Sequence, residues 1–154
     1  MTIGDAGSLL ALAQGDAALA GLLFVGTAAL VALCVPGVIT AMSISSAAIL
    51  GGWAAVPVVT LGALAGSLVL FLGVRRVDSG RTRAKLGPRF EGFERRFAKH
   101  GLWYVVGLRL CGAPHFLVTA GSALLPVRAG GFAAATLLGL LPVVAVYASA
   151  ASLL

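Results

Sequence analysis

Residues 17–74 read AALAGLLFVGTAALVALCVPGVITAMSISSAAILGGWAAVPVVTLGALAGSLVLFLGV and contain no Asp, Glu, Lys or Arg. A helix crosses the roughly 30 Å apolar core of a bilayer with about 20 residues, so this run of 58 residues holds more than one segment of that length. A signal peptide would carry positive charge ahead of its apolar part, whereas Asp5 and Asp16 are the only charges before residue 75. The stretch therefore predicts an all-α integral membrane protein that keeps its first apolar segment.

Charge is rare in this chain and is concentrated in one place. Of the 154 residues, 60% are apolar and 10% are charged, compared with roughly 25% charged residues in ordinary soluble domains. Residues 75–99 hold nine Lys or Arg and three acids, which accounts for the whole net charge of +6. A short basic loop between apolar segments follows the positive-inside rule. We therefore expect a multi-pass protein of the cell membrane with residues 75–99 in the cytoplasm, and no nucleic acid partner.

Proline and glycine divide the apolar sequence into segments. Residues 17–35 predict a transmembrane helix, which ends at Pro36-Gly37. Residues 36–52 are too few to cross the membrane and are rich in Ser, Thr and Gly, so they predict a re-entrant hairpin. The broken backbone of that hairpin must be buried in protein, because lipid offers it no hydrogen bonds. Residues 56–74 predict the next transmembrane helix.

The second half of the chain follows a similar order. Residues 75–100 predict a basic amphipathic loop on the membrane surface, with a short helix whose apolar face carries three phenylalanines. Residues 101–127 are apolar but broken by one arginine and two prolines, which predicts a second re-entrant segment. Residues 129–152 predict the last transmembrane helix. We expect residues 1–154 to form a single membrane domain.

An internal repeat appears when the sequence is shifted by 79 residues. Residues 51–55 (GGWAA) then fall on residues 130–134 (GGFAA), and Pro36 misses Pro114 by one residue. Accidental matches are also expected in so Ala-rich and Gly-rich a chain. If each copy is a re-entrant hairpin plus one transmembrane helix, the second copy enters the membrane from the opposite side. This predicts an inverted repeat, with an additional N-terminal transmembrane helix, whose broken segments meet near the midplane and form the substrate site.

Three stretches resemble the DedA and VTT-domain superfamily, also called SNARE-associated Golgi proteins. They are residues 35–37 (VPG), residues 62–75 with their Gly-x-x-x-Gly and Phe-x-x-x-Arg patterns, and residues 107–116 (GLRLCGAPHF). The resemblance covers about residues 20–150 and implies movement of lipids or lipid-linked carriers between leaflets. DedA proteins carry acidic residues in the membrane, and this chain has none in either hairpin. The chain is therefore closer to the VTT branch than to DedA proper, and proton coupling through carboxylates is not expected.

Arg109 and His115 are the candidate substrate ligands with polar side chains. An uncompensated charge at membrane depth costs about 2.5–3.5 kcal/mol, and neither apolar half contains an acidic partner for Arg109. A guanidinium matches phosphate oxygens in bidentate fashion, so we interpret Arg109 as a headgroup ligand. The alternative is a structural arginine that bonds hairpin carbonyls or reaches the interface. His115 is interpreted as a proton relay or headgroup ligand, with a packing histidine as the alternative.

The other candidate substrate-binding residues shape the backbone. Pro36 and Gly37 break the first segment, and Gly112 and Pro114 break the second. We expect these four residues to line the site as a consequence of the turns that they make. The two cysteines show no spacing typical of a metal or redox motif. The sequence therefore predicts no metal and no cofactor.

The favoured function is a membrane transporter of the lipid flippase or scramblase type, which moves an anionic lipid or a polyprenyl-phosphate carrier between leaflets. An enzyme is not expected, because no nucleophile, base and orienting acid can be assembled from the sequence. The rival functions are a non-transporting membrane assembly or chaperone protein and a transporter of a small soluble ion. The expected partners are membrane lipids with anionic headgroups, and the small-residue faces are compatible with a homo-oligomer.

Overall fold

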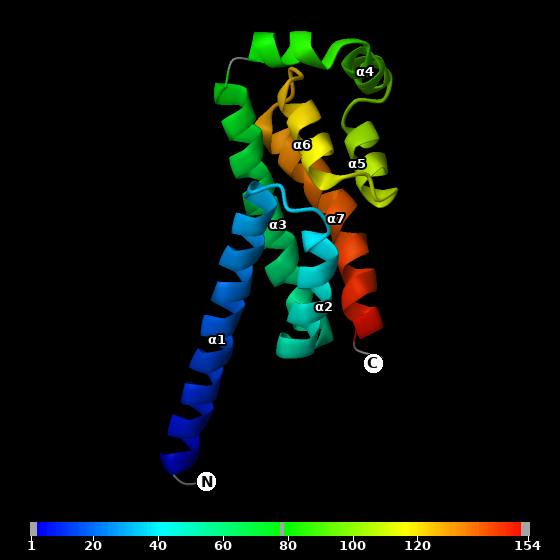
Figure 1. Ribbon diagram of the computed structural model, residues 1–154. Coiled ribbons are helices and arrows are strands. Elements are labelled where there is room, and N and C mark those ends of the chain that lie inside the picture. The colour runs from blue at the N-terminus through cyan, green and yellow to red at the C-terminus, as the bar shows by residue number, and fades with distance from the viewer. Residues whose placement is uncertain (1–2, 78, 152–154) are drawn as a thin grey trace.

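The computed structural model describes residues 3–77 and 79–151 (Figure 1), and within these ranges it contains seven helices and no strand. The helices are α1 (Ile3–Ala32), α2 (Val38–Leu50), α3 (Gly52–Arg76), α4 (Ser79–His100), α5 (Leu102–Leu110), α6 (His115–Ala123) and α7 (Ala129–Ala151). Two of them, α3 and α7, are long and apolar enough to cross a membrane. The prediction of an all-helical fold is confirmed for these residues, and the two long apolar helices are compatible with a membrane protein.

Two pairs of antiparallel helices point toward each other from opposite ends of the bundle. Figure 1 shows α1 and α2 joined by a turn at mid-height, while α5 and α6 come from the other end and are joined by a turn at the same height. We call residues 33–37 the first tip and residues 111–115 the second tip. The long helices α3 and α7 pass beside both pairs and contact each other along the bundle. The two tips therefore meet in the middle of the molecule.

The first pair differs from the hairpin expected at residues 36–52. Residues 38–50 form one uninterrupted helix, and the chain reverses before it, at the first tip, so that the end of α1 is the other arm. The serines of α2 do not break it, because a hydroxyl can bond its own helix: Ser43 Oγ donates to the carbonyl of Ile39 at 2.6 Å. The reversal instead needs Pro36, which lacks an N–H, and Gly37, whose φ of 76° is left-handed.

Helix α4 is longer than the short surface helix expected from the sequence, with 22 residues. It lies across the end of the bundle where α3 ends (Figure 1). Phe90 is buried, and Phe93 and Phe97 pack against the same apolar cluster, which includes Phe71 and Phe132. The aromatic face that the sequence indicates therefore holds α4 against the bundle.

Close approach of α1 and α3 depends on two glycines. A Cβ added at Gly62 would lie 2.8 Å from the carbonyl oxygen of Phe24, and one added at Gly66 would overlap the carbonyl oxygen of Ala28. Such small residues allow two backbones to touch where the hydrophobic effect cannot drive helices together. The small face of α3 thus fixes the position of α1, and with it the first tip.

Candidate functional site

The two tips have the same backbone geometry. In the first, the N–H of Val35 donates to the carbonyl of Leu30 at 3.1 Å, and in the second the N–H of Ala113 donates to the carbonyl of Leu108 at 3.0 Å. The residue before each donor is left-handed, with φ of 61° at Cys34 and 73° at Gly112. Both are Schellman-type helix ends followed directly by a proline. The tips correspond with an offset of 78 residues, one less than the offset of the glycine pairs.

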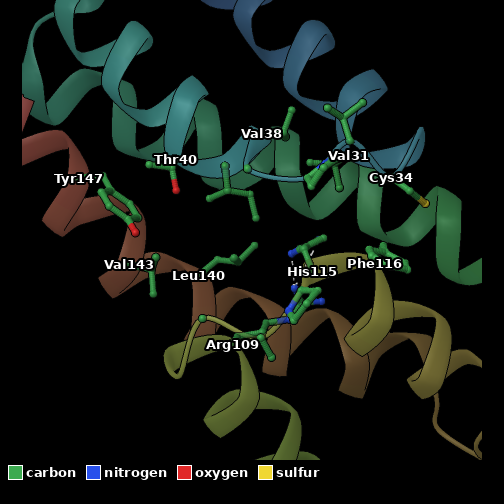
Figure 2. A pocket seen from close by; sticks show the side chains of 17 residues that line it. Val31, Cys34, Val38, Thr40, Arg109, His115, Phe116, Leu140, Val143 and Tyr147 are labelled. Atoms are coloured by element: carbon green, nitrogen blue, oxygen red, sulfur yellow. Dashed lines mark hydrogen bonds between the residues drawn. The ribbon is translucent and has the colours of Figure 1, made fainter.

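A cavity of about 320 Å³ lies between the tips. Its wall comes from the first tip, the second tip and the middle of α7, where Leu140, Val143 and Tyr147 face it (Figure 2). The six residues predicted from the sequence all line it: Pro36, Gly37, Arg109, Gly112, Pro114 and His115. The structure thus brings these residues together, while their role as substrate ligands stays a prediction.

Arg109 is buried and is surrounded by neutral groups. Its side chain is 4% exposed, and its Nη2 donates to Thr119 Oγ1 at 3.2 Å. The guanidinium carbon lies 5.6 Å from the centre of the Phe132 ring, a distance at which a cation is attracted to the ring face. Among residues 16–77 and 90–150, whose side chains the structure describes, no carboxylate contacts Arg109. Its Nε is buried without a hydrogen-bond partner.

His115 connects Arg109 to α3. Its Nδ1 lies 2.5 Å from Arg109 Nη1, and its Nε2 lies 2.6 Å from Ser67 Oγ. Ser67 Oγ in turn donates to the carbonyl of Ala63 at 2.5 Å. Figure 2 shows the two side chains meeting at the edge of the cavity. The polar groups of the second tip are therefore tied to one of the two long helices.

An aromatic stack runs from Arg109 to the end of the bundle. The Phe71 and Phe132 rings are stacked with their centres 4.4 Å apart, and the guanidinium carbon of Arg75 lies 4.9 Å from the centre of Phe71. Arg75 Nη2 also donates to the carbonyl of Leu125 at 3.2 Å. Arg75 is exposed, as expected of an interface anchor. Two buried rings thus separate an exposed cation from a buried one.

Several residues of the site were not found from the sequence. Ser67 of α3 contacts His115, and Phe132 and Gly139 of α7 lie against Arg109. A Cβ at Gly139 would lie 2.8 Å from the Cβ of Arg109. A serine or glycine in a long apolar helix carries no local signal of this role, because the contacts join residues far apart in the chain. The described ranges contain no group of His, Cys, Asp or Glu that could hold a metal.

Comparison with known families identifies one match. The sequence model of the VTT domain matches residues 35–153, from the first tip to the end of α7. No curated protein and no solved structure matches the chain. The match includes the second tip, the first tip from Val35 onward and both long helices, and therefore the whole cavity wall apart from Val31 and Cys34.

Proposed function

Because this chain belongs to the VTT-domain family, we propose that it is a multi-pass transporter of the lipid flippase or scramblase type. It moves an anionic lipid, or a lipid-linked carrier such as a polyprenyl phosphate, between the leaflets of the cell membrane. The headgroup binds between the two tips, and Arg109 is its main ligand. The lack of acidic side chains in both tips supports a position nearer to the VTT branch than to DedA proper.

The observation that carries this proposal is a buried cation at the wall of a cavity, with no anionic partner among the side chains that the structure describes. Taking a charge out of water is expensive unless it is paired, and the partners of Arg109 are a histidine, a threonine and a ring face. Charge-assisted bonds to phosphate are roughly twice as strong as neutral ones. A substrate anion would therefore supply the partner that the chain itself does not.

The matching tips support an inverted-repeat arrangement. In this interpretation the end of α1 with α2 and α3 is one copy, α5–α6–α7 is the other, and the rest of α1 is the additional N-terminal segment. The two copies enter the membrane from opposite sides, and their re-entrant tips meet near its midplane. Backbone that is not helical at this depth needs protein or a wet cavity around it. The cavity between the tips meets that requirement, and it lies where the broken segments of such transporters bind their substrates.

The size and opening of the cavity favour a headgroup over a whole lipid. Ligand pockets range over roughly 300–1,000 Å³, and a cavity of about 320 Å³ is at the lower end. Val35 and Phe116 line the cavity and are also 43% and 38% exposed. Beside them Leu110 and Leu117 are more than half exposed. The acyl chains can therefore remain in the bilayer along these side chains while the headgroup passes between the tips.

Helix α4 sets the proposed orientation. Arg95, Arg96 and Lys99 are exposed on it, and each such residue gains about 1 kcal/mol near an anionic cytoplasmic surface. We expect α4 to lie on the cytoplasmic face. A cysteine placed at the exposed Ala98, in a chain without Cys34 and Cys111, should resist impermeant maleimide in intact cells and react after the cells are opened. Rapid labelling in intact cells would contradict this orientation.

The proposed activity is tested in vesicles reconstituted with the purified protein. Vesicles carry a small amount of phosphatidylglycerol with a fluorescent headgroup, and a reductant added outside destroys the label in the outer leaflet. We expect the protected label to disappear in protein-containing vesicles and to persist in protein-free ones. Labelled phosphatidylcholine, which has no net charge, should move more slowly.

The rival functions give different results in the same vesicles. Release of trapped inorganic phosphate without movement of labelled lipid would favour a transporter of a small soluble ion. Movement of neither would favour an assembly or chaperone protein. In that case the exposed apolar faces of α3 and α7 would be contact surfaces for other membrane helices.

A further inference from the structure

The hydrogen-bond directions around His115 follow from the chemistry of its two neighbours. A guanidinium has only donors, so the Nδ1 atom that faces Arg109 at 2.5 Å accepts and carries no proton. The proton of the neutral ring is then on Nε2, which donates to Ser67 Oγ at 2.6 Å. The Ser67 hydroxyl donates its own hydrogen bond to the carbonyl of Ala63. All three bonds therefore run in one direction, from Arg109 to the backbone of α3.

We propose that His115 is an internal ligand of Arg109 that the substrate anion must replace, and that Ser67 is the positioning residue that keeps the His115 ring in the accepting tautomer. This inference rests on the proposed function, because it assigns a mechanism of anion capture and release to the same cavity. His115 then does not bind the headgroup alongside Arg109, as the sequence suggested, but competes with it.

The position of His115 allows the exchange. It is the first residue of α6, directly after Pro114, and it lines the cavity together with Arg109. The ring can turn about its two side-chain torsions without breaking a helical hydrogen bond, whereas Arg109 is held by Thr119, by Phe132 and by the close fit of its stem to Gly139. The anion therefore comes to a fixed guanidinium, and the imidazole is the group that moves.

The exchange makes capture and release reversible. A bare buried guanidinium would hold phosphate tightly and release it slowly. The His115 ring, a neutral acceptor, returns to Arg109 Nη1 when the phosphate leaves. The binding free energy of phosphate is therefore only the difference between its charge-assisted bond to Arg109 and the bond of Arg109 to imidazole. Loss of Ser67 would allow the proton to move to Nδ1, where it would face the N–H groups of Arg109. The competing ligand would then be weakened without being removed.

Nitrogen NMR of the histidines tests the exchange without any transport measurement. The chain has two histidines, and His100→Gln leaves His115 as the only signal. In phosphatidylcholine nanodiscs we expect the Nε2–H tautomer, and in phosphatidylglycerol nanodiscs a mixture of tautomers because the ring has left Arg109. Ser67→Ala should give a mixture in both. Ser43→Ala is the matched control, since Ser43 is also buried in a helix and bonds only the carbonyl four residues earlier.

The second measurement is the rate of lipid movement as a function of the fraction of labelled phosphatidylglycerol. It gives a maximal rate and the fraction of labelled lipid at half of that rate. His115→Ala should lower both by about threefold to tenfold, the factor that corresponds to one net hydrogen bond. Ser67→Ala should shift both in the same direction by less, and Ser43→Ala should shift neither. His115→Gln should recover part of the loss seen in His115→Ala, because its amide can still accept from Arg109 and donate to Ser67.

A higher half-saturating fraction in His115→Ala would overturn the proposal, since it would make His115 a ligand of the lipid. Identical NMR signals in the two kinds of nanodisc would overturn it as well. A response to inorganic phosphate in phosphatidylcholine nanodiscs, with none to phosphatidylglycerol, would support the exchange but refute a lipid as the anion. Failure of the proposed function is separate, because the wild type would then move no lipid while the NMR result still decides on the exchange.

Discussion

The two tips share a backbone but not a chemistry. Each ends a helix with the same hydrogen bonds, a left-handed residue and a proline. At the offset of 78 residues that relates them, Val31 of α1 stands where α5 has Arg109, just before the tip, and Gly37 stands where the second tip has His115. The first tip thus contributes an apolar wall, and the second contributes the polar groups that can bind an anion. Under the proposed function, one charged copy of a repeated turn is enough to make a binding site.

The largest effect is expected from Arg109, the residue that most distinguishes the tips. Arg109→Gln should lower the rate of phosphatidylglycerol movement on the order of tenfold to a hundredfold, the range expected for a lost hydrogen bond to a charged group. Arg109→Lys keeps the charge but loses the planar fork, so its rate should lie between those of Arg109→Gln and the wild type. Arg128→Gln is the matched control, because it removes an exposed arginine outside the cavity.

Thermal unfolding in detergent separates binding from structure for this residue. A binding arginine leaves the unfolding midpoint of Arg109→Gln close to that of the wild type. The interpretation is wrong if Arg109→Gln unfolds the protein, since Arg109 is then structural. It is equally wrong if the variant stays folded and moves lipid normally.

The next effect comes from the glycines that hold the first pair of helices. Gly66→Ala should lower the stability of the fold by about 1–3 kcal/mol, the usual cost of overpacking, because its Cβ would overlap the carbonyl of Ala28. Gly73→Ala lies on the same helix with no atom within 4 Å of the added carbon. It should be neutral or slightly stabilising. The measurement is the unfolding midpoint of both variants in detergent.

The second pair has its own glycine contact, and its replacement should affect activity more than stability. Gly139→Ala would place a carbon 2.8 Å from the Cβ and 3.1 Å from the Cδ of Arg109, a milder overlap than at Gly66. A small shift of α5 against α7 relieves it and displaces the guanidinium. We expect a severalfold loss of lipid movement with a smaller change in midpoint than for Gly66→Ala. Gly130→Ala, also on α7 but in open space, is the control. Equal activities of the two variants would show that the placement of Arg109 does not limit transport.

The sequence predicts the places where the chain breaks better than the contacts around them. Pro36, Gly37, Gly112 and Pro114 act locally, through a missing N–H or a left-handed φ, so their pattern alone indicates a turn. The four residues that make the turns, together with the polar Arg109 and His115, are therefore found on one cavity as the sequence predicts. The extent of α2 was less predictable, because the sequence does not reveal that Ser43 bonds its own helix.

The partners of Arg109 could not be predicted. The polar network joins residues up to 48 positions apart, from His115 to Ser67, and periodicity reports only neighbours on one element. The contact of Phe132 with Arg109 could not be predicted either, since a phenylalanine in an apolar helix is normally a packing residue. The role of these side chains depends on α3 and α7 lying beside the second tip, which is a property of the tertiary structure.

The smallest expected effect exchanges the left-handed residues of the two tips. Cys34 has a φ of 61°, a conformation that costs a residue with a side chain about 1–2 kcal/mol, whereas Gly112 occupies the equivalent position without that cost. Cys34→Gly should therefore raise the unfolding midpoint slightly. The gain stays below the full strain, because glycine loses about 0.5–1 kcal/mol more conformational entropy on folding. Gly112→Ala should lower the midpoint by a similar amount. The added carbon meets no other atom, so the only cost is that of a left-handed φ in a residue with a side chain.

Cys111→Gly controls for the loss of a cysteine side chain. Cys111 precedes the left-handed residue of the second tip and has a φ of −77°, which any residue adopts. Its replacement relieves no strain and should lower the midpoint, because only the entropic cost of glycine remains. If Cys34→Gly and Cys111→Gly lower the midpoint equally, the left-handed geometry of the first tip is not maintained in the folded protein, and the two tips are not equivalent turns. Opposite signs would show that both tips keep the same backbone and differ only in the side chains they carry.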